Sequence, residues 1–472
     1  MEENPKIEIS ETNRGKEQII INKKYKYNIS TIKKDKSIVY RCTEYRTLNK
    51  CKSFIILNDK KEILKYEGLH NHLERDFEAS LSITKHKIKE EIKKSVAPFD
   101  IKRKRIFDEI SQGVGYICPE YNSIKSQIAR NINKQFPPDV LTYDQIPEKS
   151  EYYKTLRGEN FMIFKNSNII VFQSPFQAKI FSQYGDHVFV DGTFYIAPKF
   201  SYQVFITRNY VKELNSFYTT SFSILENKEQ ETYETLFMEL KKNVLTYHNN
   251  KISPKFFHCD FERAISNAAQ KIFPNINIKF CIWHYKRSLE IKKNELCYNE
   301  VKDNNNICNY YKAISNFPFI NPEYIFDIYN DIKEICQTQN YNQFLKFLEY
   351  YKKTYLISYK IEHWNYYNNM EHITNNASES FNNHLNNYFE KKPSFNKLLY
   401  TLRKEESLSY NDYERKIGRI WEKKIIKFRK TNKINNIIRD YKNEESQLIY
   451  RNEIIDLWYD CLTKLNNLTT NL

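Results

Sequence analysis

The sequence predicts an α/β protein built from several domains, and three observations support this. The chain has 472 residues, a length that favours about three domains. Between about residues 185 and 285, apolar runs of strand length alternate with longer runs of helical period. Before this region lie short strand-like runs, and after it, over 286–370, lies an aromatic-rich helical pattern. We therefore expect a central α/β domain with an α-helical insertion, preceded by a small β-rich module.

The N-terminal module is predicted at residues 20–78. Residues 1 to about 20 are polar, and we expect them to be disordered. The runs YKYNIS, SIVYRC, CKSFIIL and EILKYEG then alternate or cluster apolar residues, as short strands do. A module of this size has little core of its own, so its stability requires another source.

A metal ion is the expected source of that stability. The module contains a complete Cys₂His₂ ligand set for structural Zn²⁺. Its two thiols and two imidazoles belong to Cys42, Cys51, His70 and His72. The His-x-His spacing suits a strand, where residues i and i+2 point the same way. The alternative is two incidental cysteines and two surface histidines. Basic side chains near the ligands are candidates for DNA contacts: Arg46, Lys50 and Lys52.

A helical segment is predicted over residues 81–180, with helices near 100–111 and 122–135. Ile124, Ile128, Ile132 and Phe136 recur every fourth residue, and Pro137-Pro138 ends that helix. The exposed face carries Lys125 and Arg130, which permits a DNA-binding helix-turn-helix. A plain helical bundle with a solvated basic face is equally open. The basic run Lys102 to Arg105 fits a nuclear import signal, a phosphate contact or a charged turn.

The central domain is predicted at 185–285 as three strands followed by helix, strand, helix and strand. That is the order of an RNase H-like fold. The expected strands are 187–195, 200–208, 216–225, 255–259 and 277–283, and the expected helices are 229–246 and 262–272. A helical insertion over 286–370 precedes a core helix within 371–395, and the remainder, 396–472, is helical and basic.

Three acidic residues mark the candidate catalytic site. Asp191 in HVFVDGTFYI and Asp260 in PKFFHCDFERA close apolar runs, and Glu379 in TNNASESFNNHL opens a helix. A carboxylate at a strand end lies at a sheet edge, where α/β folds build sites. Carboxylates are the oxygen ligands that Mg²⁺ or Mn²⁺ prefers, and a pair of such ions supports phosphoryl transfer.

Each acid also has an ordinary structural interpretation. Asp191 could be a turn residue before Gly192, and Asp260 could cap the following helix. Glu379 stands at capping-box spacing from Asn376. Glu379 also points nearly away from the apolar face of its own helix, so it reaches the sheet only if that helix packs on a second face.

The local sequences around these positions are DGTF, HCDFERA, CIWH and TNNASESFN. Together they closely resemble the Mutator-like (MULE) transposases over about residues 140–400. The resemblance implies that Asp191, Asp260 and Glu379 are catalytic metal ligands, and that Cys281 and His284 lie near the active site. Two such ligands alone do not close a zinc site. The segment with the Cys₂His₂ set resembles FLYWCH fingers and their WRKY-like relatives, β-rich zinc modules that bind DNA.

These features predict a DDE-type DNA transposase that cleaves and joins DNA strands. The expected partners are double-stranded DNA at element ends and target, and a second copy of the chain or more. A domesticated DNA-binding regulator is the alternative, and an RNA-processing nuclease shares the fold. The chain holds 74 basic and 58 acidic side chains, a net charge of +16, which favours a polyanionic partner, although AT-rich coding would also enrich lysine.

Cysteine usage and hydropathy indicate the cellular compartment of the protein. Nine cysteines, an odd number without a repeating framework, argue against a secreted disulfide scaffold. The N-terminus lacks a signal-peptide core and no stretch has the length of a membrane span. We therefore expect no membrane partner and a soluble, intracellular protein located in the nucleus.

Overall fold

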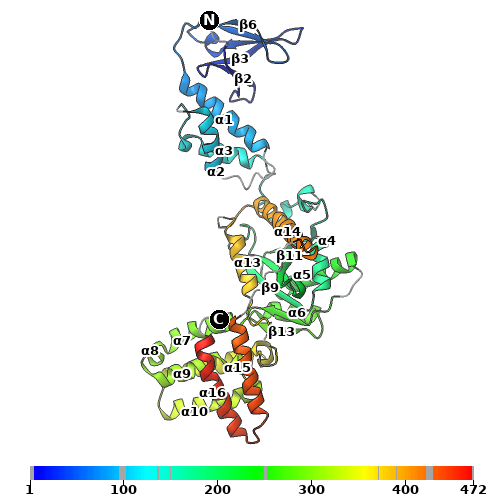
Figure 1. Cartoon of the computed structure of the whole chain (residues 1–472), viewed down its shortest axis with the longest axis vertical. Coiled ribbons are helices and arrows are strands. Elements are labelled where there is room, and N and C mark those ends of the chain that lie inside the picture. The colour runs from blue at the N-terminus through cyan, green and yellow to red at the C-terminus, as the bar shows by residue number, and fades with distance from the viewer. Residues whose placement is uncertain are drawn as a thin grey trace. The chain divides into compact units, whose positions relative to one another are not determined.

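The computed structural model describes residues 5–94, 103–115, 117–135, 138–148, 150–248, 252–369, 371–389, 391–420 and 429–469. Three residues used above, Lys102, Phe136 and Pro137, lie outside the described residues, as does 421–428 in the basic C-terminal region. The chain divides into two compact units, Met1–Pro138 and Asp139–Leu472 (Figure 1).

Unit 1 begins with a six-stranded antiparallel sheet in sequential order. Its strands are β1 (Ile7–Glu11), β2 (Glu17–Ile21), β3 (Tyr25–Ile32), β4 (Ile38–Cys42), β5 (Phe54–Leu57) and β6 (Ile63–Glu67). The expectation of disorder before residue 20 is wrong for β1 and β2. The reason is the run Ile19, Ile20 and Ile21, which is fully buried: Ile19 and Ile21 join the core of the sheet, and Ile20 packs on the next helix.

Three helices complete unit 1: α1 (Asp76–Lys94), α2 (Arg103–Val114) and α3 (Tyr121–Asn133). They share a core in which Ile124, Ile128 and Ile132 lie on one face of α3. The basic run opens α2, where Lys104 pairs with Asp108 and Arg105 with Glu109 one turn later. In the described part of this run, the charge therefore forms a solvated helix face.

Unit 2 contains a seven-stranded sheet in the order β13-β12-β9-β10-β11-β8-β7. Its strands are β7 (Met162–Lys165), β8 (Ile169–Phe172), β9 (His187–Thr193), β10 (Gln203–Val211), β11 (Ser216–Leu225), β12 (Phe256–Cys259) and β13 (Asn277–Phe280). Strands β12 and β13 run parallel to β9, whereas β10, β11, β8 and β7 continue antiparallel.

Two sequence-based boundaries are corrected here. The segment 139–180 was expected to be helical, but it belongs to unit 2 and adds β7 and β8 to the sheet. All four residues of β8 are buried, so this strand lacks the alternation that identifies a half-exposed strand. The last predicted strand, 277–283, ends at Phe280, and α7 starts at Ile282.

Helices cover both faces of this sheet (Figure 1). One face packs on α4 (Pro175–Gln183), α5 (Gln230–His248) and α6 (Arg263–Ile272). The opposite face packs on α13 (Asn376–Asn386) and α14 (Phe395–Ile417). Successive strand residues alternate between the two cores: Phe205 of β10 joins the first, and its neighbours Val204 and Ile206 join the second. The result is a mixed α/β domain of three layers.

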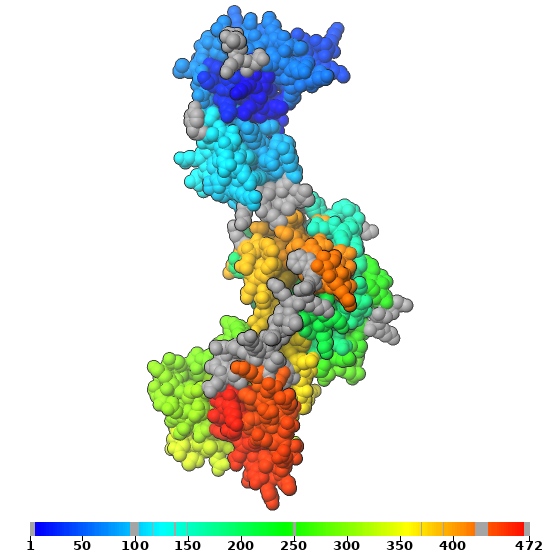
Figure 2. Space-filling view, viewed as in Figure 1, coloured from blue at the N-terminus to red at the C-terminus, as the bar shows by residue number. Residues whose placement is uncertain are grey.

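The segment between β13 and α13 is helical. Its helices are α7 (Ile282–Leu296), α8 (Tyr298–Asp303), α9 (Asn305–Ser315), α10 (Ile325–Thr338), α11 (Asn342–Tyr351), a π-helical segment (Lys352–Ser358) and α12 (Ile361–Trp364). The C-terminal helices α15 (Arg429–Glu445) and α16 (Arg451–Thr469) pack beside them (Figures 1 and 2). Trp458 and Ile438 belong to the same core as α10 and α11, so the C-terminal region is part of this helical body.

Among the described helices, none combines the length and the apolar character that crossing a lipid bilayer requires.

Candidate functional site

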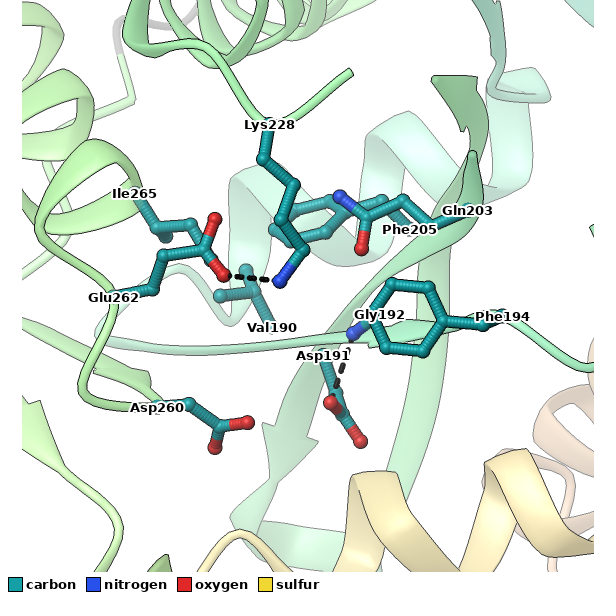
Figure 3. A pocket seen from close by; sticks show the side chains of 10 residues that line it. All are labelled: Val190, Asp191, Gly192, Phe194, Gln203, Phe205, Lys228, Asp260, Glu262 and Ile265. Atoms are coloured by element: carbon teal, nitrogen blue, oxygen red, sulfur yellow. Dashed lines mark hydrogen bonds and ion pairs between the residues drawn. The ribbon is translucent and has the colours of Figure 1, made fainter. Parts of the chain in front are cut away.

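Three carboxylates converge at one edge of the unit 2 sheet. Asp191 lies in β9, Asp260 directly follows β12, and these two strands pair in parallel. Glu379 lies in the first turn of α13. All three line one open cleft of about 1010 Å³, and Figure 3 shows the carboxyl groups of Asp191 and Asp260 close to each other. The parallel pairing explains the convergence, because the carboxyl ends of parallel strands meet at one sheet edge.

Helix α13 packs against β9 through polar side chains. The Asn375 amide donates to the Val190 carbonyl at 2.9 Å, and the Asn382 amide donates to Asp191 Oδ2 at 2.6 Å. The apolar face of the helix, with Leu385, enters the core on the same side of the sheet. The helix therefore packs on two faces, which is the condition that brings Glu379 to the sheet.

The structure does not place the three acids in their alternative structural roles. Asp191 lies within a strand, and its own carboxylate accepts from the Gly192 amide at 2.8 Å. The N-cap residue of α6 is Glu262, so Asp260 lies outside the capping position. The N-cap of α13 is Asn375, which puts Glu379 one position beyond the capping-box glutamate.

The site concentrates negative charge on partly buried carboxylates. Burial raises the pKa of Asp191 to about 7, and the charge of Asp260 acts in the same direction. Burial also raises the pKa of Glu379, against the opposing influence of His284. Neighbouring carboxylates are costly to ionise together. A cation between them makes their ionised forms favourable.

His284 and Cys281 lie at the edge of this acidic group. His284 Nδ1 lies 2.9 Å from Asp260 Oδ1 and 3.8 Å from Glu379 Oε1, and Cys281 Sγ lies 3.9 Å from Glu379 Oε1. Burial would lower the pKa of His284, but its contacts with Asp260 and Cys281 raise it to about 10. The pair predicted to lie near the active site is thus in direct contact with two of the acids.

The carboxylate oxygens that line the cleft are of the ligand type that Mg²⁺ or Mn²⁺ prefers. Asp260 Oδ1 and His284 Nδ1 are buried and lie 2.9 Å apart, and neither atom makes a hydrogen bond of good geometry within the described residues. Among the described residues, the ligand atoms that lie within 4.8 Å of one another here are those of Asp260, Cys281 and His284, a mixed set that does not include Asp191 or Glu379. The C-x-x-H motif offers only two ligands in the sequence, because Asp260 comes beside it only in the fold.

A second ligand cluster lies in unit 1, where the Cys₂His₂ residues meet. Cys42 Sγ lies 3.3 Å from His72 Nε2, Cys51 Sγ lies 3.4 Å from His70 Nδ1, and the two histidine nitrogens are 3.1 Å apart. Tetrahedral Zn²⁺ with these ligands requires separations of about 3.4 to 3.8 Å. The observed separations lie within about 0.3 Å of this range, so the four residues fit one zinc ion. The histidines follow β6 in irregular backbone, so the strand expected for them is wrong.

Neighbouring side chains fix the orientation of this cluster. The Tyr27 hydroxyl lies 2.8 Å from His70 Nε2, and the Tyr25 ring stacks on His70 at 3.6 Å. Burial lowers the pKa of His70 to about 4, which keeps the imidazole neutral, as metal binding requires. Burial raises the pKa of Cys42 to about 12, so its thiolate forms only with a cation beside it.

The side chains predicted to meet DNA lie on the surface of unit 1. Arg46, Lys50 and Lys52 are exposed around Cys51, and Lys125 and Arg130 are exposed on α3. Lys125 approaches Asn122, and Arg130 approaches the Ser126 carbonyl, so both occupy the solvated face of their helix. Contact with DNA at any of the five stays a prediction.

Several residues at the site escaped the sequence analysis. Arg208 of β10 donates to the Ala377 carbonyl in the first turn of α13 and to the Phe217 carbonyl at 2.9 Å. Lys228 pairs with Glu262 at 2.7 Å beside the two aspartates (Figure 3). Only Glu262 had a signal, its position two residues after Asp260. Arg208 and Lys228 come from strands and loops that only the fold brings together.

Comparison with known families finds one matching stretch in each unit of the chain. The model of the MULE transposase domain matches residues 187–288, and the model of the FLYWCH zinc finger domain matches residues 9–72. Both resemblances are confirmed. The first match includes Asp191, Asp260, Cys281 and His284, and Glu379 lies beyond its end. The chain has no match among curated proteins.

Proposed function

We propose that this protein is a DNA transposase whose unit 2 cleaves DNA strands and joins a 3′-hydroxyl to target DNA. The observation that carries the proposal is the convergence of Asp191, Asp260 and Glu379 in one cleft of a chain that also has a FLYWCH zinc finger domain. The strand order β11-β10-β9-β12-β13 supports an RNase H-like domain, the fold on which such nucleases are built.

The chemistry is phosphoryl transfer. In hydrolysis, water attacks the phosphorus, the bond from phosphorus to O3′ breaks, and a 3′-hydroxyl and a 5′-phosphate result. In strand transfer, that 3′-hydroxyl attacks a target phosphodiester and displaces another 3′-oxygen. Bound Mg²⁺ or Mn²⁺ would lower the pKa of the nucleophile and neutralise charge on the phosphate.

The residues of the chain divide this work. Asp191, Asp260 and Glu379 would hold the cation, Asn382 orients Asp191, and Asn375 and Arg208 hold α13 against the sheet. His284 contacts Asp260 and Glu379 and keeps the two acids in place. The carboxylates themselves would repel a phosphate, so their contribution would be to hold the cation where negative charge develops on the transferred phosphoryl group.

The zinc module and the basic face of α3 would bind element ends, through phosphate contacts by Arg46, Lys50, Lys52, Lys125 and Arg130. Function on two DNA ends implies at least a dimer, and DNA as substrate implies a nuclear location. A domesticated DNA-binding regulator is the second candidate, because the FLYWCH domain serves either role. The intact acidic triad favours the enzyme.

Substitution of one carboxylate tests the enzyme proposal. Asp260→Asn should abolish Mg²⁺-dependent cleavage of labelled duplex DNA, while affinity for the same DNA at matched salt stays within about twofold of the unmodified chain, because the fold and the basic surfaces remain. Asp186→Asn is the matched control, since Asp186 stands just before β9 at its opposite end and pairs with Lys255 at the surface. Undiminished cleavage by the Asp260 variant would refute the triad.

A further inference from the structure

Exposed aromatic rings stand beside the carboxylates of unit 2. Phe194 follows β9 and is 45% exposed, and Tyr202 precedes β10 and is 47% exposed. Both line the same cleft as Asp191 and Asp260. The loop between them is not loose, because Ile196, Ala197 and Pro198 are buried. The loop thus buries its centre and leaves large rings along the cleft, those of Phe194, Tyr202 and the neighbouring Tyr195.

A lysine lies over the rings of Phe194 and Tyr202. Lys228 Nζ is 5.1 Å from the centre of the Phe194 ring and 5.9 Å from that of Tyr202, and the rings meet edge to face at 5.3 Å. Figure 3 shows the lysine between Glu262 and the Phe194 ring. The ammonium is therefore held beside π-faces and also points into the acidic site.

The lysine is fixed by a chain of hydrogen bonds. Glu262 accepts from Lys228 at 2.7 Å and from the Tyr233 hydroxyl at 2.9 Å, and Tyr233 accepts from the Gln203 amide at 2.7 Å. Glycine at position 192 permits this network, because a Cβ there would lie 2.3 Å from Gln203 Oε1. Lys228 is still about one-third exposed, so its charge remains accessible to a ligand.

We propose that Phe194, Tyr202 and Lys228 form a binding subsite for one unpaired DNA nucleotide next to the phosphodiester that is cut. The base stacks on an exposed ring, and the adjacent phosphate pairs with the Lys228 ammonium. A base inside a duplex is covered by its neighbours on both faces, so only an unpaired or extruded base offers a π-face to a side chain. This inference rests on the proposed function and adds the form of the substrate, a locally opened strand.

The test compares two labelled DNA duplexes of equal paired length, one blunt and one with a four-nucleotide 3′ overhang. Fluorescence anisotropy with the full chain, at one fixed salt and without added Mg²⁺, gives both affinities. We expect the overhang to be bound at least about fivefold more tightly, the lower end of the contribution from one stacked base. Equal affinities would overturn the subsite.

Two variants assign that preference to the rings and the lysine. The double variant Phe194→Leu/Tyr202→Leu keeps apolar bulk but removes both π-faces, so it should bind the two duplexes equally. Lys228→Gln should weaken binding to the overhang and reduce its salt dependence by about one phosphate contact. Preference retained by the double variant would also overturn the proposal, and thermal melting checks that each variant is folded.

A matched control uses a similar pair outside the cleft. Tyr298 of α8 is 49% exposed and has Lys302 Nζ 6.0 Å from its ring centre, so Tyr298→Leu should leave the preference unchanged. An equal loss there would show that exposed tyrosines in general, and not this subsite, create the preference.

The Asp191→Asn variant separates this proposal from the proposed function. Its cleavage should vanish and its overhang preference should remain. If it still cleaves, the catalytic assignment fails while the subsite stands. If Asp191→Asn is inactive, and neither it nor the unmodified chain prefers the overhang, the subsite fails and the nuclease stands.

Discussion

At the scale of single residues, the site depends on amides as much as on carboxylates. Asn382 donates to Asp191 Oδ2, and the opposite oxygen accepts from the Gly192 amide. These two donors fix both oxygens of an acid that burial makes costly to ionise. The sequence indicated Asp191 through its place at a strand end. It could not indicate Asn382, because the contact spans a large sequence separation and depends on how α13 meets β9.

Removal of this amide should weaken metal binding without removing a ligand. Asn382→Leu is expected to lower the cleavage rate about tenfold to a hundredfold at limiting Mg²⁺, as loss of an orienting partner of a metal ligand does. A Mg²⁺ titration of the cleavage rate measures this, and higher Mg²⁺ should recover part of the loss. Asn383→Leu, at the exposed neighbouring position in the same cleft, is the control. Equal Mg²⁺ requirements in the two variants would contradict an orienting role.

At the scale of elements, α13 is the piece that completes the site. Its central position was predicted from Glu379, and the order of β9 to β13 was predicted from apolar runs. Strands β1, β2, β7 and β8 were not predicted. Ile19–Ile21 and β8 are buried through most of their length, and a continuously buried run has no alternation to identify it. Burial alone does not separate the missed strands from the predicted ones, because β10 and β11 are almost fully buried and were predicted, whereas β1 and β7 are only partly buried and were missed.

Arg208 links β10 to α13. It is almost completely buried, its pKa is lowered to about 10 by burial, and its guanidinium donates to the Ala377 carbonyl. Arg208→Met keeps much of the volume and removes the donor. We expect faster amide hydrogen exchange in α13 and at least a tenfold slower cleavage, because Glu379 is held less well. Unchanged exchange over residues 376–386 would show that the asparagine contacts alone hold the helix.

The specificity of that effect can be checked on the other side of the sheet. Lys271→Met removes the exposed partner of Glu234, a surface ion pair between α6 and α5. Such pairs contribute little, so exchange in α13 and cleavage should both stay as in the unmodified chain.

At the scale of the whole molecule, the two units obtain stability in different ways. Unit 2 has large shared cores, one of which extends from the sheet into the helical body and α15–α16. That extension could not be predicted from the sequence, since 396–472 showed helical period and positive charge but no sign of its packing partner. The sheet of unit 1 has a small core, and the two cysteines of the proposed zinc site are buried members of it. A module of this kind depends on its ion.

Loss of zinc should therefore unfold the sheet of unit 1 and leave unit 2 folded. Cys42→Ser/Cys51→Ser should bind one Zn²⁺ fewer per chain, measured by atomic absorption. Amide exchange should rise throughout β2 to β5 and stay unchanged in β9 to β11.

The same variant should lose DNA specificity but keep the nuclease. Its affinity for element ends should fall toward that for unrelated DNA at physiological salt. Mg²⁺-dependent cleavage of unrelated DNA at low salt should persist, because Asp191, Asp260 and Glu379 all lie in unit 2. The partly buried pair Cys118→Ser/Cys308→Ala, outside the ligand cluster, is the control. Full protection of β2 to β5 in the zinc-ligand variant would mean that burial of Ile19, Ile21 and Tyr27 stabilises this sheet without the ion.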